Sequence, residues 1–196
     1  MPTIKRIYCL QCKYPKVTCV CDAVTTIILP IKVIVLQHKK EKLHSKNTIR
    51  LACLVSPSIQ VINTSVVTET NQLLADLDIN HAVVLYPSSQ SKAIEGIGEK
   101  RNQIHTIILI DGSWKQAYSI WQSFPKLRSF AQIHFEFPPQ KQYEIRKSKK
   151  TYQLSSIEAL SYSIATLTKI DTSAYGLVFA KMQERWRKIH SQRSGS

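Results

Sequence analysis

Short runs of apolar, mostly β-branched residues constrain the fold of this chain more than any other feature of its sequence. The clearest runs are 31–37 (IKVIVLQ), 81–87 (HAVVLYP) and 103–111 (QIHTIILID), and segments with helical patterns separate them. A strand that is apolar almost throughout is buried on both faces, as in a parallel sheet covered by helices. The pattern therefore predicts an α/β fold with a mostly parallel sheet and flanking helices.

The remaining segments complete the predicted order of elements. Helices are expected over 48–56, 70–78, 113–124, 155–170 and 174–190, and further strands over 58–63 and 131–137. Residues 38–47 are interpreted as a polar, basic loop. Ligands of parallel sheets bind beyond the carboxyl ends of the strands. We expect 86–90, 111–114 and 154–159 to lie at such ends or at helix starts.

Residues 1–25 form a distinct cysteine-rich segment, and 26–196 are expected to form the α/β domain. The cysteines of this segment are Cys9, Cys12, Cys19 and Cys21. Their C-x2-C-x6-C-x-C spacing can surround one tetrahedral Zn²⁺ with thiolates. Unrelated reduced thiols or a redox pair are the alternatives. So short a segment has few core residues, which favours a structural zinc site that holds it together.

The chain is strongly basic, with 27 Lys and Arg residues against 13 Asp and Glu residues. A net charge of +14 makes a polyanion the first partner to consider, because cationic side chains release counterions from phosphates. The dense basic segment 38–50 (HKKEKLHSKNTIR) is interpreted as a phosphate-contacting surface, with a solvated loop as the alternative. An anionic membrane surface has weaker support, since no long basic amphipathic helix is obvious before the last 20 residues.

The sequence contains no apolar stretch long enough to span a bilayer and no apolar core of a secretory signal near its start. We therefore expect a cytoplasmic protein without a membrane partner, and no obligate protein partner is evident. In a reducing compartment, cysteines are ligands or core residues more often than disulfides. Cys53, in an apolar helical segment, is expected to be a buried small hydrophobe.

Two predicted helices begin with a capping signal. Ser113 and Gln116 match the S-x-x-Q form of a capping box, and Ser155 and Glu158 match the S-x-x-E form. Such helix starts present backbone amides that can also hold polar groups of a ligand. Local structure and ligand binding are therefore both expected at these positions.

The stretch DGSW (111–114) raises a question of chemistry. Trp114, Tyr118 and Trp121 recur on one helical face, which is typical of an aromatic core stripe. Asp111 closes a buried strand beside a helix start. It can cap that helix from outside, or it can accept a proton from a bound substrate. The residues alone leave both roles open.

Together, these motifs resemble the DTW-domain family of tRNA-uridine aminocarboxypropyltransferases. The matching positions follow the family's order: Cys9, Cys12, Pro15, Cys19, Cys21 and Asp22; His38, Glu41, Asn47 and Thr48; Leu85, Tyr86 and Pro87; Asp111, Ser113 and Trp114; Tyr143 and Arg146; and Ser156, Glu158 and Ala159. Two positions depart from the family pattern. Ser113 replaces a threonine and keeps the hydroxyl, and Ile49 replaces a glycine, which weakens the expectation of a tight backbone approach there.

The resemblance implies a SPOUT-like fold, in which the chain forms a trefoil knot at the site of S-adenosylmethionine. It further implies transfer of the 3-amino-3-carboxypropyl group to N3 of a uridine in tRNA, with release of 5′-methylthioadenosine. A SPOUT-type RNA methyltransferase that uses the same donor is the nearest alternative. A zinc-containing RNA-binding module without catalysis is the second.

The resemblance also implies roles for individual residues. Asp111 is the expected general base, which removes the N3 proton of the uridine. Cofactor contacts are expected from Leu85, Tyr86, Pro87, Asp111, Ser113, Trp114, Leu154, Ser155, Ser156 and Glu158. Contacts to tRNA are expected from His38, Lys39, Lys40, Lys46, Asn47, Arg50, Arg146 and Lys147, with the cofactor carboxylate as an alternative partner of Arg146.

Overall fold

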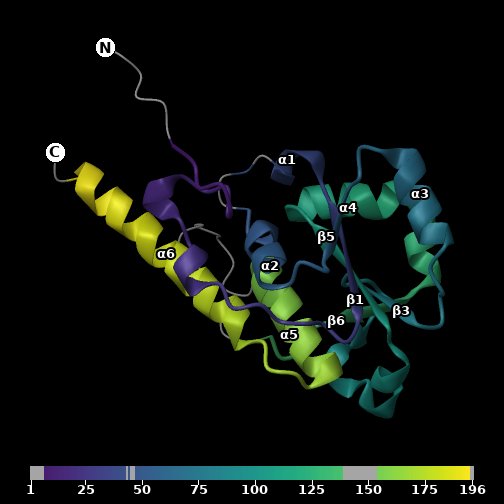
Figure 1. Cartoon of the computed structure of the whole chain (residues 1–196). Coiled ribbons are helices and arrows are strands. Elements are labelled where there is room, and N and C mark those ends of the chain that lie inside the picture. The colour runs from purple at the N-terminus through teal and green to yellow at the C-terminus, as the bar shows by residue number, and fades with distance from the viewer. Residues whose placement is uncertain (1–6, 43, 45–46, 139–153, 195–196) are drawn as a thin grey trace.

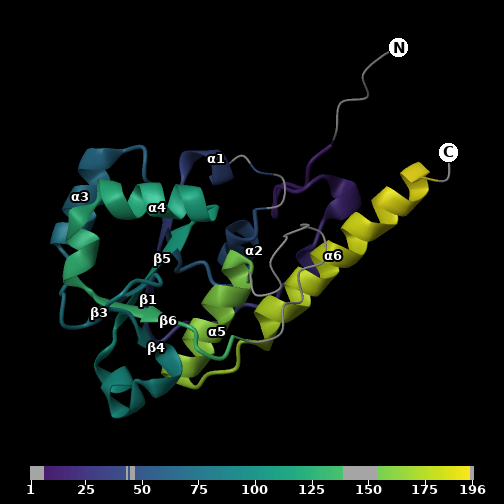
Figure 2. The same cartoon turned by 180° about the vertical axis from the view of Figure 1, so that it is seen from behind.

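A computed structural model describes residues 7–42, 44, 47–138 and 154–194 of the chain. Figures 1 and 2 show a central sheet with helices on both of its faces. The described residues form a six-stranded sheet in the order β2-β1-β5-β3-β6-β4, and each pair of neighbouring strands is parallel. The predicted α/β class is therefore confirmed.

The elements follow the chain in this order. The strands are β1 (Lys32–Gln37), β2 (Gln60–Asn63), β3 (Ala82–Leu85), β4 (Lys92–Ala93), β5 (Thr106–Asp111) and β6 (Ala131–His134). The α-helices are α1 (Lys39–Lys42), α2 (Ile49–Val55), α3 (Val67–Ala75), α4 (Trp114–Ser123), α5 (Ser156–Thr168) and α6 (Ser173–Ser194). Short 3-10 helices cover Lys16–Thr18, Cys21–Ala23, Ile94–Gly96, Gly98–Gln103 and Pro125–Ser129.

Alternate residues of the central strands point to opposite faces of the sheet and enter two separate cores. The core shared with α2, α5 and α6 receives Val33, Val35, Val83, Ile107 and Leu109. The core shared with α3 and α4 receives Ile34, Leu36, Val84, Ile108 and Ile110. Figure 1 shows the same division, with α2, α5 and α6 on one side of the sheet and α3 and α4 on the other.

The register of the sheet brings several strand ends to one edge. Gln37, the last residue of β1, pairs with Asp111, the last residue of β5. On the other side of β5, Leu85 at the end of β3 pairs with Leu109. This edge is where a parallel sheet of this kind binds its ligands.

The cysteine-rich segment packs directly on the α/β domain. Cys12, Tyr14 and Val20 are buried in the same core as α2, α5 and α6. The hydroxyl of Tyr14 also donates a hydrogen bond of 3.0 Å to the backbone oxygen of Asn47. The segment therefore shares the core of the domain, while the division at residue 25 stays a prediction.

Some elements differ from the sequence prediction. The expected basic loop contains α1, a single turn that is too short to show a helical period. The helix expected over 70–78 lies at Val67–Ala75. Between β3 and β5, where no element was predicted, the chain forms β4 and 3-10 helices. No α-helix in the described ranges is long and apolar enough to cross a membrane. The trefoil knot stays a prediction.

Candidate functional site

Asp111 connects three segments that are far apart in the sequence. Its side chain is only 5% exposed at the end of β5. Gln37 Nε2, at the end of β1, donates a hydrogen bond of 2.9 Å to Asp111 Oδ2. The hydroxyl of Ser156, the first residue of α5, donates to Asp111 Oδ1. The carboxylate therefore holds the ends of two adjacent strands against the start of a helix.

In this arrangement the Asp111 carboxylate keeps lone pairs that can accept a further hydrogen bond or a proton. A carboxylate oxygen offers two lone-pair directions, and each oxygen here uses one of them for a protein donor. The two donors fix the orientation of the carboxylate, and the start of α5 places a positive dipole end beside it. Asp111 can thus serve as a structural link and as a proton acceptor for a ligand at the sheet edge.

Both predicted capping boxes are present. Ser113 N donates to Gln116 Oε1 at 2.6 Å, and Gln116 N donates to Ser113 Oγ at 3.4 Å, which starts α4. At α5, Ser155 N donates to Glu158 Oε2 at 2.7 Å and Glu158 N donates to Ser155 Oγ at 3.5 Å. These bonds fix two of the three predicted ligand-binding segments.

Gly112 connects Asp111 to the first of these boxes and leaves no room for a side chain. A Cβ atom at Gly112 would lie 2.9 Å from Cβ and 3.1 Å from Oε1 of Gln116. We expect Gly112→Ala to displace Gln116, break the cap and destabilise the protein by about 1 kcal/mol or more.

The matched control is Gly176→Ala in α6, where an added Cβ meets nothing within 4 Å. This change is expected to stabilise the protein by up to about 1 kcal/mol, because alanine favours a helix interior over glycine. Thermal unfolding of both variants measures the difference. A shift of Tm in the same direction for both would contradict the assigned role of Gly112.

The segment after β3 is fixed to the sheet. The ring of Tyr86 stacks on Trp121 of α4, with 4.4 Å between ring centroids and 13° between the planes. The Ser88 hydroxyl donates to Oε1 of Gln132, and Ser91 Oγ lies 2.9 Å from Nδ1 of His134. The third predicted ligand-binding segment is therefore held in place by β6 and α4.

The basic positions divide into groups. Lys39 and Lys40 of α1 are exposed, and the backbone nitrogen of His38 donates to the Asp111 carbonyl at 3.0 Å. Arg50 lies over the ring of Tyr14, 4.4 Å from its centroid. Asn47 is buried, with its Nδ2 donating to the Glu41 carbonyl at 3.0 Å and its Oδ1 accepting from Arg50 N at 3.2 Å. The other predicted contacts, Lys46, Arg146 and Lys147, lie outside the described residues.

Sequence reasoning missed Gln37 as a partner of Asp111. A signal was available, since Gln37 is the polar last residue of a predicted strand whose end must face the same edge. Cys53 of α2 is half-buried and packs against the core. Burial, and then the charge of Asp111, raise the pKa of Cys53 to about 11, so its thiol stays protonated at neutral pH.

The four cysteines of the N-terminal segment form a compact cluster of sulfurs. Their Sγ atoms all lie within 4.8 Å of one another, with 3.7 Å between Cys9 and Cys21 and 3.7 Å between Cys12 and Cys19. Thiolates at about 2.3 Å from a tetrahedral Zn²⁺ are separated by about 3.8 Å. The cluster therefore has the dimensions of a closed metal site with four cysteine ligands.

The pKa values in the cluster move in opposite directions. Hydrogen bonds from the backbone amides of Cys12 and Gln11 lower the pKa of Cys9 to about 6. Burial and the neighbouring thiols raise the pKa of Cys21 to about 12. Some of the sulfurs thus hold protons that a metal ion would have to displace.

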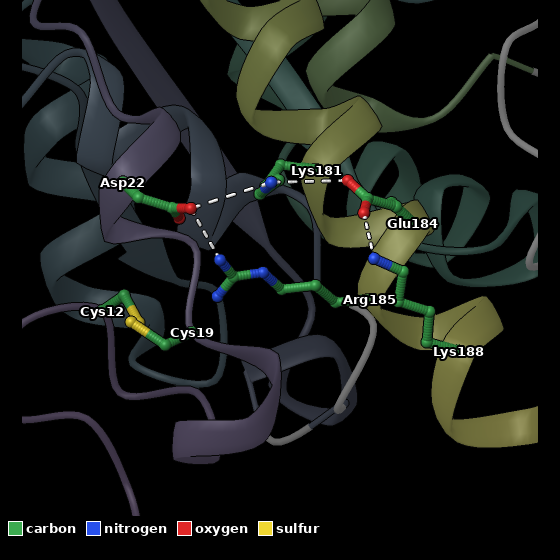
Figure 3. A network of polar contacts seen from close by, with 7 residues as sticks. All are labelled: Cys12, Cys19, Asp22, Lys181, Glu184, Arg185 and Lys188. Carbon is green, nitrogen blue, oxygen red and sulfur yellow. Dashed lines mark hydrogen bonds and ion pairs between the residues drawn. The ribbon is translucent and has the colours of Figure 1, made fainter. Parts of the chain in front are cut away.

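A charge network ties this segment to α6, as Figure 3 shows. Asp22 Oδ2 accepts a hydrogen bond of 2.6 Å from Arg185 Nη2 and lies 3.7 Å from Lys181 Nζ. Glu184 pairs with Lys181 at 3.4 Å and with Lys188 at 2.6 Å. These groups are partly or fully exposed, so each pair contributes little to the stability of the fold. The network orients the segment, while the buried core residues hold it.

Comparison with known proteins gives one family and several relatives. A family model described as DTW domain matches residues 6–187. A Drosophila melanogaster protein named tRNA-uridine aminocarboxypropyltransferase 2 is 29% identical over 85% of this chain and 68% of its own length. Proteins of the same name from Macaca fascicularis and Mus musculus are 27% and 28% identical, over 86% and 84% of this chain. The alignments cover only 59% and 58% of these two proteins. No solved structure matches the chain.

Proposed function

Because the chain belongs to the DTW domain family, we propose that it transfers the 3-amino-3-carboxypropyl group of S-adenosylmethionine to N3 of a uridine in tRNA. The names of the three relatives support the reaction class. The structural observation that carries the proposal is the position of Asp111, where the ends of β1 and β5 meet the start of α5.

The same edge suits the donor. Gln37, Asp111 and Ser156 bring the end of β5 against α5, and β3 lies next to β5. The amides in the first turn of a helix have no partners within the helix and can bind polar groups of a ligand. The residues proposed to hold S-adenosylmethionine are Leu85, Tyr86, Pro87, Ser113, Leu154, Ser155, Ser156 and Glu158, while the exposed ring of Trp114 faces the RNA. S-adenosylmethionine would supply a carbon that is activated by its bond to the sulfonium sulfur. When this C–S bond breaks, the sulfur keeps the electron pair and departs as part of neutral 5′-methylthioadenosine.

Asp111 acts as the general base in this proposal. Its carboxylate accepts the N3 proton of the uracil, and the electron pair of the N–H bond stays on N3 to form the new N–C bond. Gln37 and Ser156 hold the carboxylate still, so that proton transfer and bond formation coincide in one geometry. Nothing in this step requires a catalytic metal, because the leaving group is already activated.

The cysteine cluster binds Zn²⁺ in a structural role. All four ligands come from the protein, which leaves no open coordination position for a substrate. In the same segment, the Tyr14 ring lies under Arg50 and its hydroxyl donates a hydrogen bond to the backbone oxygen of Asn47. The segment therefore shapes the surface near α1 and α2.

The tRNA lies across the basic surface around α1 in this proposal. Exposed Lys39 and Lys40, together with Arg50, supply positive charge next to the strand-end site, and the backbone nitrogen of His38 donates to the Asp111 carbonyl there. Asn47 is buried, so it holds the neighbouring loop in shape. Lys46, Arg146 and Lys147 add charge in the sequence. A tRNA substrate agrees with a cytoplasmic location.

Labelling the donor at either of two positions tests the proposal. Purified protein is incubated with unmodified tRNA and with S-adenosylmethionine labelled either in the carboxyl carbon or in the methyl group. We expect only the carboxyl label to enter the tRNA. Entry of the methyl label would instead identify an RNA methyltransferase, and tight tRNA binding without transfer of either label would identify a non-catalytic RNA-binding module.

A further inference from the structure

Two large aromatic side chains stand in solvent directly after Asp111. Trp114 and Tyr118 of α4 are each 57% exposed, although their helical spacing is typical of a core stripe. Only Trp121, the third member of the stripe, is buried, at 7% exposed. Residues at this i, i+4 spacing are neighbours on one face of a helix. Two adjacent exposed aromatic rings beside a candidate active site indicate a surface that binds a ligand or a macromolecular partner.

The exposed pair has a rigid support. Trp121 stacks on Tyr86, at the end of β3, with 4.4 Å between ring centroids. Tyr118 follows Trp114 by four residues and precedes Trp121 by three, so it lies between these two residues on the same side of α4. Ala117 and Ile120, on the adjoining side of α4, are buried in the same core as Trp121. We call Tyr86, Trp114, Tyr118 and Trp121 the aromatic face; it follows the edge of the sheet at which Asp111 lies.

The segment that carries Trp114, Tyr118 and Trp121 has only positive charges. Residues 114–129 contain no acid and carry three exposed cations: Lys115, Lys126 and Arg128. The Arg128 guanidinium lies over the ring of Trp121, 5.7 Å from its centroid. On the other side, a Cβ at Gly112 would lie 3.5 Å from Cβ of His38, so basic α1 begins against the turn into α4. Figures 1 and 2 both show α1 beside one end of α4.

We propose that Trp114 and Tyr118, the exposed members of the aromatic face, stack on unpaired bases of the tRNA next to the target uridine. This inference rests on the proposed function and adds a substrate-binding surface to it. Aromatic rings interleaved with Lys and Arg form the common surface for single-stranded RNA, because every base offers a face to stack on and a phosphate to neutralise. A second copy of this chain would bring like charges together, which disfavours a dimer at this face.

Equilibrium binding of unmodified tRNA, measured without S-adenosylmethionine, tests the inference. We expect Tyr118→Ala to weaken binding about tenfold, the effect typical of losing one stacked base. Tyr118→Phe keeps the ring and should bind like the unchanged protein. Leu177→Ala, which removes an exposed apolar side chain of α6 on the other side of the sheet, is the matched control and should also leave binding unchanged.

Salt dependence separates stacking from phosphate contact. Lys39→Ala should reduce the slope of log affinity against log salt concentration by about 1, because one phosphate contact is lost. Tyr118→Ala should leave this slope unchanged, since stacking releases no counterions. Both variants should keep the thermal stability of the unchanged protein, because the side chains they remove are exposed.

Normal affinity of Tyr118→Ala for tRNA would overturn the inference, whether or not the protein modifies tRNA. A change of molecular mass in sedimentation equilibrium, with unchanged tRNA affinity, would overturn it by assigning the face to a dimer contact. The converse result separates the two proposals. Binding that depends on Tyr118, without transfer of the carboxyl label, would leave this inference standing and would refute the proposed function.

Discussion

Cys12→Ser is expected to release the metal and to detach the N-terminal segment from the domain. Cys12 is buried, and its Sγ lies 3.7 Å from that of Cys19 within the four-sulfur cluster. Loss of a structural metal is among the few single changes that cost more than about 4 kcal/mol. Tyr14 and Val20, which reach the main core from this segment, would be exposed as it unfolds.

Zinc content by atomic absorption and thermal unfolding measure this effect together. The matched control is Cys53→Ala, because Cys53 is the one cysteine outside the cluster. The control should keep its zinc and lose much less stability. A strong chelator should lower the Tm of the unchanged protein toward that of Cys12→Ser. Full zinc occupancy and an unchanged Tm in Cys12→Ser would contradict the assigned site.

Asp111→Asn is expected to lower the rate of tRNA modification by a factor of about 10²–10⁴, the usual contribution of a general base. Asparagine has nearly the same shape and can exchange hydrogen bonds with Gln37 and Ser156 after their polar groups reorient. The fold should therefore survive, while the group that accepts the N3 proton is lost. Single-turnover rates with saturating tRNA and donor measure the change.

A purely structural role of Asp111 gives a different result. In that case Asp111→Asn would lower the Tm, and the protein that remains folded would modify tRNA at the normal rate. Ser156→Ala is the matched control, because it removes one hydrogen bond of the same carboxylate and keeps the carboxylate itself. We expect this control to retain activity within about tenfold and to bind tRNA normally.

The elements that the sequence predicted well are those with strong local signals. The runs 31–37 and 103–111 contain β1 and β5, because β-branched residues buried on both faces allow few other structures. The boxes at Ser113 and Ser155 were readable because the hydroxyl and its partner are only three residues apart. The spacing of the four cysteines likewise predicted that their sulfurs would lie close together.

Features that depend on the order of strands in the sheet could not be predicted from such local signals. The hydrogen bond between Gln37 and Asp111 exists because β1 lies beside β5, two strands that are 74 positions apart at these residues. The period of the aromatic stripe on α4 placed Trp114, Tyr118 and Trp121 on one face. It did not show that the first two lie beyond the edge of the core. A one-turn helix such as α1 is too short to produce a period at all.

The proposed transfer of an aminocarboxypropyl group to a tRNA uridine is tested by the mass of the modified nucleoside. After incubation with S-adenosylmethionine, the tRNA is digested to nucleosides, and these are analysed together with the small products. We predict a uridine in which one hydrogen is replaced by a 3-amino-3-carboxypropyl group, in amounts equal to the 5′-methylthioadenosine released. A methylated uridine accompanied by S-adenosylhomocysteine, or uridine that stays unmodified, would contradict the proposed transfer.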